Sequence, residues 1–125
     1  MPRILVVDDQ ADVRVMIAML LRVNHFEVVE AGNAADALRA FEEAAFDGAI
    51  VDIFLGDGCG LDLVSMMRDR APRLAVVVVS GMATVDAVPD LSDMICLQKP
   101  FRPAELLRAV SSARGAVSWP MAVSA

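Results

Sequence analysis

The feature that most constrains the fold of this chain is the spacing of its apolar residues. Short continuous apolar runs alternate with segments in which apolar residues have helical spacing. Runs of about four to six apolar or β-branched residues are typical of strands buried on both faces. Apolar residues spaced by three and four are typical of helices with one apolar side. This alternation predicts parallel strands joined by helical crossovers. We expect strands at residues 3–8, 26–31, 48–52, 75–80 and 94–98, and helices at 11–23, 34–44, 61–70 and 104–113.

Single residues mark the ends of these expected elements. Asn33 is suited to cap the second helix, because its side-chain oxygen can accept from the first turn. Pro72 ends the third helix, and Pro103 stands where the first turn of the last helix begins. The glycine-rich stretch Phe54–Gly60 is expected to be a loop.

The length and hydrophobic content of the chain indicate one domain of the α/β class. The chain has 125 residues, of which 57% are hydrophobic, and this share favours elements that are covered on both sides. Short connections and right-handed crossovers leave a five-stranded, doubly wound parallel sheet as the main topology. We expect the domain to occupy residues 1–114 and the tail 115–125 to be flexible.

Charge and composition exclude several classes of function. The formal net charge is −6, with no basic patch, which argues against direct binding of nucleic acid. No apolar run is long enough to span a membrane, and the N-terminus lacks the layout of a signal peptide. Cys59 and Cys96 lie far apart without ligand partners, so we expect reduced thiols in a cytoplasmic protein.

Polar residues stand at the carboxyl ends of four expected strands. Asp8 and Asp9 end the first strand, Asp52 the third and Ser80 the fourth, while Lys99 follows the fifth. In a doubly wound sheet these ends form the ligand-binding edge. Clustered carboxylates repel each other, and oxygen-only ligands favour Mg²⁺ over metals that prefer nitrogen or sulfur.

This set of groups is typical of a phosphoryl-transfer site. It offers a carboxylate nucleophile, carboxylates for a metal, a hydroxyl and an ammonium group for phosphate oxygens. Each residue alone has a purely structural interpretation: Asp9 could cap the helix that begins at Ala11, and Ser80 could be a turn residue. Their joint occurrence at the strand ends of one sheet favours the functional interpretation.

Four motifs resemble the receiver domain of two-component response regulators, the CheY-like superfamily with a flavodoxin-like sheet of order 2-1-3-4-5. The resemblance extends from about Arg3 to Arg114. The matching stretches are ILVVDDQ at 4–10, IVDIFLGDGCG at 50–60, VVVVSG at 76–81 and LQKPF at 97–101.

The resemblance implies a role for each residue at this edge. Asp52 corresponds to the phosphoacceptor. The Mg²⁺ ligands would be Asp8, Asp9, Asp52 and the backbone carbonyl of Phe54. Ser80 corresponds to the switch hydroxyl and Lys99 to the lysine that pairs with the phosphoryl group, followed by a cis bond to Pro100.

The resemblance also implies partners and the kind of activity. The phosphodonor would be a histidine kinase or a histidine phosphotransfer protein, and a downstream protein would receive the signal. A homodimer is compatible with such a domain. The domain would act as a switch rather than an enzyme, with only self-catalysed phosphoryl transfer and dephosphorylation.

The sequence departs from the family pattern on the side that normally carries the output. Cys96 occupies the position of the usual aromatic switch residue. The stretch between Ser80 and Lys99 is short by about one helical turn and contains Pro89, so we expect a short or irregular fourth helix. Gly56 replaces a common proline and should loosen its loop.

Phe54 and Met82 each stand two residues after a site residue, Asp52 and Ser80. In receivers these positions line the approach of water to the phosphoryl group. Two bulky apolar side chains there would exclude water, which leads to the hypothesis of a long-lived phospho-Asp52.

Three other functions have some support in the fold or the motifs. A pseudo-receiver would use the same fold only to bind a protein, independently of phosphorylation. A phosphatase of the aspartyl-phosphate type needs a second carboxylate where this chain has Phe54. A dinucleotide site would need G-x-G-x-x-G after the first strand, whereas the glycines at 56–60 follow the third with a different spacing.

Overall fold

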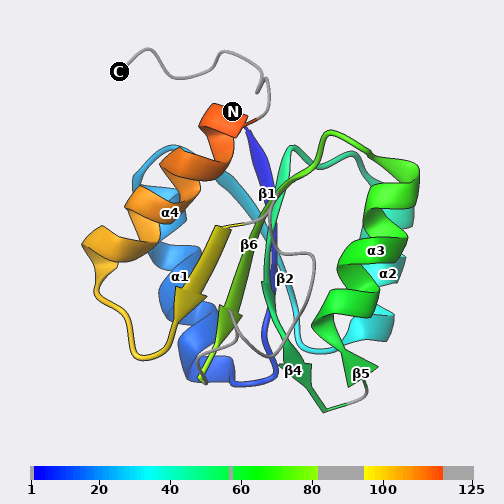
Figure 1. The fold of residues 1–125 in the computed structure, drawn as a ribbon, viewed down its shortest axis with the longest axis horizontal. Helices are drawn as coiled ribbons and strands as arrows, with labels where there is room; N and C mark the ends of the chain where they lie inside the picture. The colour runs from blue at the N-terminus through cyan, green and yellow to red at the C-terminus, as the bar shows by residue number, and fades with distance from the viewer. Residues whose placement is uncertain (1, 57, 82–94, 117–125) are drawn as a thin grey trace.

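Five parallel strands form the centre of the molecule in a computed structural model that describes residues 2–56, 58–81 and 95–116 (Figure 1). Two layers of helices enclose the sheet. The strands of the sheet are β1 (Arg3–Val7), β2 (Glu27–Ala31), β3 (Gly48–Asp52), β6 (Ala75–Ser80) and β7 (Ile95–Gln98). The helices are α1 (Ala11–Val23), α2 (Ala34–Glu43), α3 (Gly60–Arg70) and α4 (Pro103–Ala116).

The strand order is β2-β1-β3-β6-β7, with every neighbouring pair parallel, so the predicted doubly wound sheet is confirmed. The chain leaves β1 toward β2 on one side and then returns to β3 on the other. The winding direction therefore reverses between β1 and β3. Their carboxyl ends form the crevice in which doubly wound sheets bind ligands.

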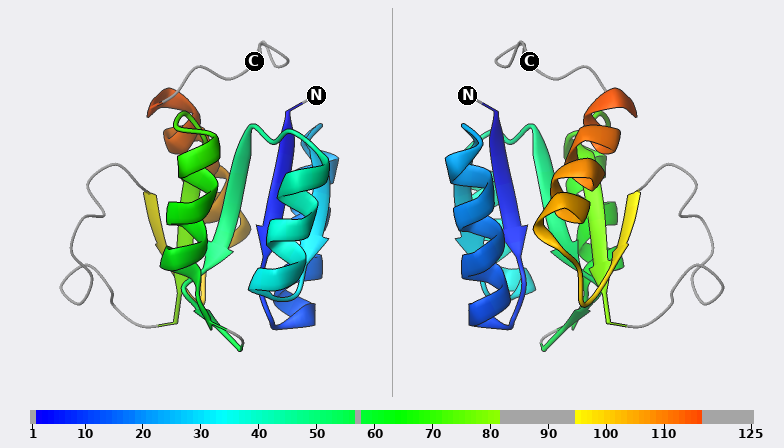
Figure 2. Two further views of the ribbon diagram at one scale, coloured as in Figure 1. Left: turned by 90° about the vertical axis from the view of Figure 1, so that its right-hand side faces the viewer. Right: turned by 90° about the vertical axis from the view of Figure 1, so that its left-hand side faces the viewer.

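The four helices divide evenly between the two faces of the sheet. α1 and α4 cover one face, and α2 and α3 cover the other (Figure 2). Alternate residues of β1 supply the two cores, since Ile4 and Val6 face α1 and α4 while Leu5 and Val7 face α2 and α3. This alternation is the period of two that any strand imposes on its side chains. Every residue of β3 and β6 is buried, as expected for strands covered on both faces.

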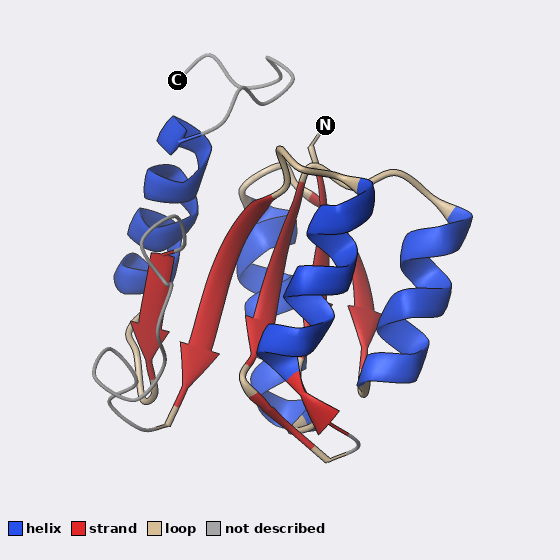
Figure 3. Ribbon diagram, turned by 45° about the vertical axis from the view of Figure 1, so that its right-hand side comes forward, coloured by secondary structure: helices blue, strands red, loops and turns tan. Residues whose placement is uncertain are grey.

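The structure corrects the expected loop at 54–60. Phe54–Leu55 and Gly58–Cys59 pair as a small antiparallel hairpin, strands β4 and β5, at the end of the sheet toward which the strands point (Figure 3). Two residues per strand are too few to show an alternating pattern, so these strands have no periodic signal in the sequence.

Other expected boundaries hold to within a few residues. β1 ends at Val7 rather than Asp8, and α4 continues to Ala116, beyond the expected end at Ala113. The expected fourth helix, with Pro89, and Met82 lie in 82–94, outside the described residues, as does most of the tail expected at 115–125. None of the helices in the described ranges combines the length and apolar character needed to cross a bilayer.

The two predicted caps have different outcomes. Asn33 caps α2, since its Oδ1 accepts a 2.7 Å hydrogen bond from the backbone N–H of Asp36. At α1 the N-cap is Gln10, not Asp9, and its side chain makes no capping hydrogen bond. The structural interpretation of Asp9 as a cap is therefore wrong.

α3 begins unusually close to the end of β3, at a residue where only glycine fits. A Cβ built on Gly60 would overlap the carbonyl oxygen of Asp52 and lie 2.9 Å from its carbonyl carbon and 3.0 Å from the Cα of Ile53. The N–H of Gly60 donates to the carbonyl oxygen of Ile53 at 2.6 Å. The absence of a side chain thus lets the first turn of α3 lie against the backbone of Asp52.

Gly60→Ala should therefore lower the free energy of unfolding by about 1–3 kcal/mol, because backbone atoms must move to admit the methyl group. Gly58→Ala is the matched control, since no atom of the described residues other than its chain neighbours lies within 4 Å of its Cβ position. Urea unfolding of both variants measures the difference. Equal effects would show that the close approach to Asp52 does not restrict residue 60.

Candidate functional site

Asp8 is a buried carboxylate held by a dense set of backbone contacts. The residue is 1% exposed, directly after β1, and its Oδ1 accepts a 2.9 Å hydrogen bond from the N–H of Gln10. Its backbone carbonyl accepts from Arg14 Nη1 at 3.0 Å, and its N–H donates to the carbonyl of Ala31. Asp8 is thereby fixed between β2 and the start of α1.

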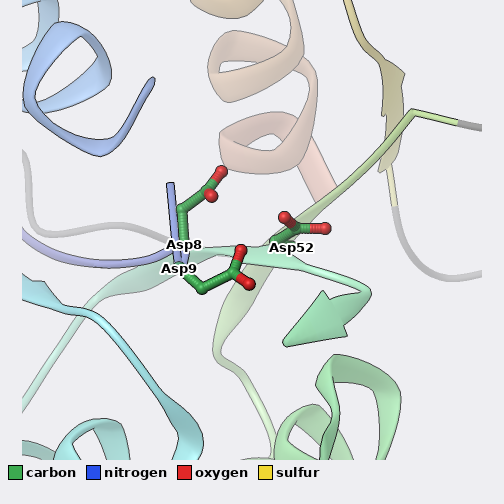
Figure 4. A group of neighbouring side chains, drawn as sticks. All are labelled: Asp8, Asp9 and Asp52. Carbon is green, nitrogen blue, oxygen red and sulfur yellow. The ribbon is translucent and has the colours of Figure 1, made fainter. Parts of the chain in front are cut away.

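Asp52 lies opposite, at the end of β3. It is also buried, and its Oδ1 accepts a 3.1 Å hydrogen bond from the N–H of Phe54. Asp9 is exposed, and its carboxylate completes the group (Figure 4). One oxygen from each of Asp8, Asp9 and Asp52 lies within 4.8 Å of the others. The expected cluster of carboxylates therefore forms at one edge of the sheet.

Lys99 reaches into this cluster from the segment after β7. Its N–H donates to the carbonyl of Ser80 at 2.7 Å, and its bond to Pro100 is cis, as the resemblance implies. Its Nζ lies 3.0 Å from Asp8 Oδ2 and 3.0 Å from Asp52 Oδ2. The ammonium group bridges the two buried carboxylates and offsets part of their repulsion.

The ammonium group has a third acceptor that the motifs did not single out. Gln10 Oε1 accepts a 2.8 Å hydrogen bond from Lys99 Nζ. One signal was present in the sequence: glutamine stands where the helix 11–23 needs a cap, although Ser, Thr, Asp and Asn are the preferred caps. Gly60 and Arg14 were also missed, because their roles depend on contacts with backbone atoms of Asp52 and Asp8.

The donor set suits a hard divalent cation. It consists only of carboxylate oxygens, and one of the three residues, Asp9, is open to solvent. Mg²⁺ prefers a few carboxylates and keeps several water ligands, so an open all-oxygen cluster matches it. The residues that could hold the ion are Asp8, Asp9 and Asp52, with the carbonyl of Phe54 as the fourth expected ligand.

The pKa values of Asp52 and Lys99 are each set by burial together with neighbouring charges and hydrogen bonds. Burial raises the pKa of Asp52, and the nearby charge of Asp8 adds to this, although hydrogen bonds from Lys99 and Phe54 oppose it. Burial alone would lower the pKa of Lys99, but hydrogen bonds and charges of Asp8 and Asp52 outweigh it and raise that pKa. Lys99 therefore stays charged at neutral pH.

The remaining residues that the sequence singled out lie on β4, β5, β6 and β7. Ser80 is buried at the end of β6, one residue beyond Val79, which is the parallel partner of Asp52. Phe54 is 57% exposed beside the cluster. Cys96 is exposed on β7 and Cys59 on β5, both as free thiols.

The sequence matches the family model of the response regulator receiver domain over residues 4–111. The chain belongs to the response-regulator receiver family. The assignment agrees with the alternating strands and with the acidic edge described above. Gly56 follows β4, Gly58 lies in β5 and Gly60 begins α3, so these glycines do not form a loop after the first strand.

Individual receivers show how far the similarity extends. The DNA-binding response regulator MtrA of Mycobacterium tuberculosis is 33% identical over 110 residues, which cover 86% of this chain and 48% of MtrA. The receiver domain of NtrX from Brucella abortus superposes with a TM-score of 0.80 at 30% identity, over 88% of this chain and 96% of that one. TrrA from Thermotoga maritima, solved in complex with Mg²⁺-BeF, has a similar fold, with a TM-score of 0.82 at 24% identity over 90% of this chain and 99% of TrrA.

The chain spans only 23% to 49% of the length of the first curated relatives that it matches. Those relatives carry further sequence beyond the receiver. The receiver is thus the part that this chain shares with them.

Asp52→Asn should stabilise the metal-free receiver at neutral pH. A folded pKa above the unfolded value means that ionised Asp52 opposes folding, and the asparagine removes this cost. The gain should be largest above the folded pKa and should disappear as the pH falls below the ordinary value of 3.8, where Asp52 is protonated in both states.

Thermal unfolding in EDTA across this pH range measures the effect. Asp69→Asn is the control, because it removes one exposed carboxylate from α3, away from the cluster. A lower stability of Asp52→Asn at neutral pH would mean that the pairing with Lys99 outweighs the burial.

Proposed function

We propose that this receiver accepts a phosphoryl group on Asp52 from a histidine kinase or a histidine phosphotransfer protein, with Mg²⁺ as cofactor. The observation that carries the proposal is the position of Lys99 Nζ, 3.0 Å from both Asp8 Oδ2 and Asp52 Oδ2, beside three clustered carboxylates. Such a lysine can move to a phosphate oxygen without leaving the site.

In the transfer step an oxygen of Asp52 attacks phosphorus while the bond between phosphorus and the donor's imidazole nitrogen breaks. The electron pair of that bond stays on the imidazole. Bound Mg²⁺ would neutralise charge on the transferring oxygens, as in other phosphoryl transfers. The chain itself aligns the nucleophile, because the N–H of Phe54 holds Asp52 Oδ1 and Lys99 holds Oδ2.

The phosphoryl group would add roughly 1.5 to 2 negative charges at a buried position. Lys99 balances part of this charge, and the Ser80 hydroxyl donates to a phosphoryl oxygen in the active state. Ser80 and Lys99 are joined through the backbone bond from Lys99 N–H to the Ser80 carbonyl. A displacement of either residue toward the phosphoryl group would therefore also move the backbone at the ends of β6 and β7.

The proposed setting is the cytoplasm, where the kinase would present its phosphohistidine. The proposed output is binding of a downstream protein or formation of a homodimer through the changed surface. Cys96 has no ring to rotate, so the output differs from one that depends on an aromatic switch residue. MtrA is DNA-binding, but the charge of −6 favours a protein target for this domain.

Incubation with acetyl phosphate and Mg²⁺ should give a single phosphate adduct in the intact mass spectrum. The adduct should disappear with EDTA and in Asp52→Asn, since the metal and the nucleophile are both required. Asp12→Asn, which removes an exposed carboxylate on α1 outside the cluster, should be phosphorylated like the parent. A protein that binds Mg²⁺ but forms no adduct with this donor or a phosphorylated histidine protein would instead act as a pseudo-receiver.

Phe54→Asn should shorten the lifetime of phospho-Asp52. Phe54 is exposed and its backbone N–H contacts Asp52 Oδ1, and a polar side chain at this position would admit and orient water. We expect hydrolysis to be about two- to tenfold faster, which corresponds to a barrier lower by about 0.4–1.4 kcal/mol. Phe54→Leu keeps the apolar character and should retain most of the lifetime. An equal or longer lifetime in Phe54→Asn would contradict the shielding hypothesis.

A further inference from the structure

Gln10 makes a contact that phosphoryl transfer to Asp52 does not by itself require. Its Oε1 accepts a 2.8 Å hydrogen bond from Lys99 Nζ across 89 positions of the chain. An ammonium group has three N–H donors, and Asp8, Asp52 and Gln10 supply three side-chain acceptors. The direction of all three donors is thereby fixed.

Gln10 stands at the N-cap position of α1, where its contact with Lys99 leaves the helix without a side-chain cap. Gln10 is the N-cap, but its side chain does not cap the helix. Ser, Thr, Asp or Asn at an N-cap normally stabilises a helix, because a short side-chain oxygen reaches the N–H groups of the first turn. Gln10 is therefore a poor helix cap that contacts Lys99 instead. Such a departure from the local residue preference is expected at positions that function constrains.

The backbone of Gln10 is also held at the site. Its N–H donates to Asp8 Oδ1 at 2.9 Å, and its carbonyl accepts from the N–H of Arg14 at 2.9 Å. These two bonds fix the base of the side chain relative to Asp8. Gln10 is exposed whereas Asp8 and Asp52 are buried, so its contact with Lys99 lies on the solvent side of the cluster.

We propose that Gln10 is a positioning residue that holds the third donor of Lys99 until a phosphoryl oxygen replaces it. The proposal rests on the function proposed for Asp52. Gln10 is the neutral acceptor among the three, so its bond to the ammonium group lacks the attraction between opposite charges that Asp8 and Asp52 add. Lys99 therefore releases Gln10 first and turns this donor to the phosphoryl group while it keeps its carboxylate partners.

Lys99 is the single lysine of the chain, which allows a direct test. Protein grown with lysine that is isotope-labelled at Nζ has one such signal, which comes from Lys99. NMR relaxation of this signal reports how ordered the ammonium group is. Three variants separate the possible roles of residue 10. Gln10→Met keeps the length without the oxygen, Gln10→Ser supplies a helix cap without the reach, and Gln10→Glu keeps the acceptor with a charge.

In the metal-free protein, the Lys99 side chain should be less ordered in the Met and Ser variants than in the parent. Their phosphorylation by acetyl phosphate and Mg²⁺ should be about three- to tenfold slower, which is the range expected for the loss of one net hydrogen bond. Gln10→Ser should nevertheless melt about 4 °C higher than the parent, because it gains a cap. Gln10→Glu should keep Lys99 ordered but react more slowly, since a charged acceptor is harder to release.

Two results would overturn the proposal. One is unchanged order of Lys99 in the Met and Ser variants, and the other is an unchanged rate of phosphorylation despite lost order. Failure of the parent protein to form any adduct would refute the function proposed for Asp52 instead. The order of Lys99 would still show whether Gln10 holds it.

Discussion

Three carboxylates at one edge of a sheet repel one another, and the ammonium group of Lys99 is the positive charge that lies directly between the two buried ones. Its Nζ is 3.0 Å from an oxygen of Asp8 and 3.0 Å from an oxygen of Asp52. Burial alone would favour the neutral forms of both the lysine and Asp52, yet the pairing raises the pKa of Lys99. The charge of this lysine allows the acidic cluster to remain at a buried position.

The parallel sheet brings these groups together. β1 and β3 are adjacent and parallel, so Asp8 and Asp52 leave the sheet at the same end. β6 and β7 continue the order, and the backbone bond from Lys99 to Ser80 connects the end of one strand to the segment after the other. A change in charge at Asp52 therefore acts on side chains and backbone groups from several elements at once.

The close approach of α3 to the end of β3 completes the support of the site. Gly60 lets the helix begin against the backbone of Asp52, and the hairpin β4–β5 carries Phe54 beside the acceptor. On the other side Gln10 leaves α1 without a side-chain cap and contacts Lys99. The glycine at the start of α3 and the glutamine at the N-cap of α1 both lie next to the reactive groups.

The sequence by itself determined the fold class, most element boundaries and the residues of the acidic edge, because strand and helix periods are local properties and the motifs stand at strand ends. It also indicated the cap at Asn33, and the resemblance to the receiver family implied the cis bond before Pro100. Only the tertiary structure decided that Gln10 rather than Asp9 is the N-cap residue of α1, that residues 54–55 and 58–59 pair as a hairpin, and that Lys99 has a third partner. These features depend on contacts between residues up to 89 positions apart, or on two-residue strands, and neither leaves a periodic pattern in the sequence.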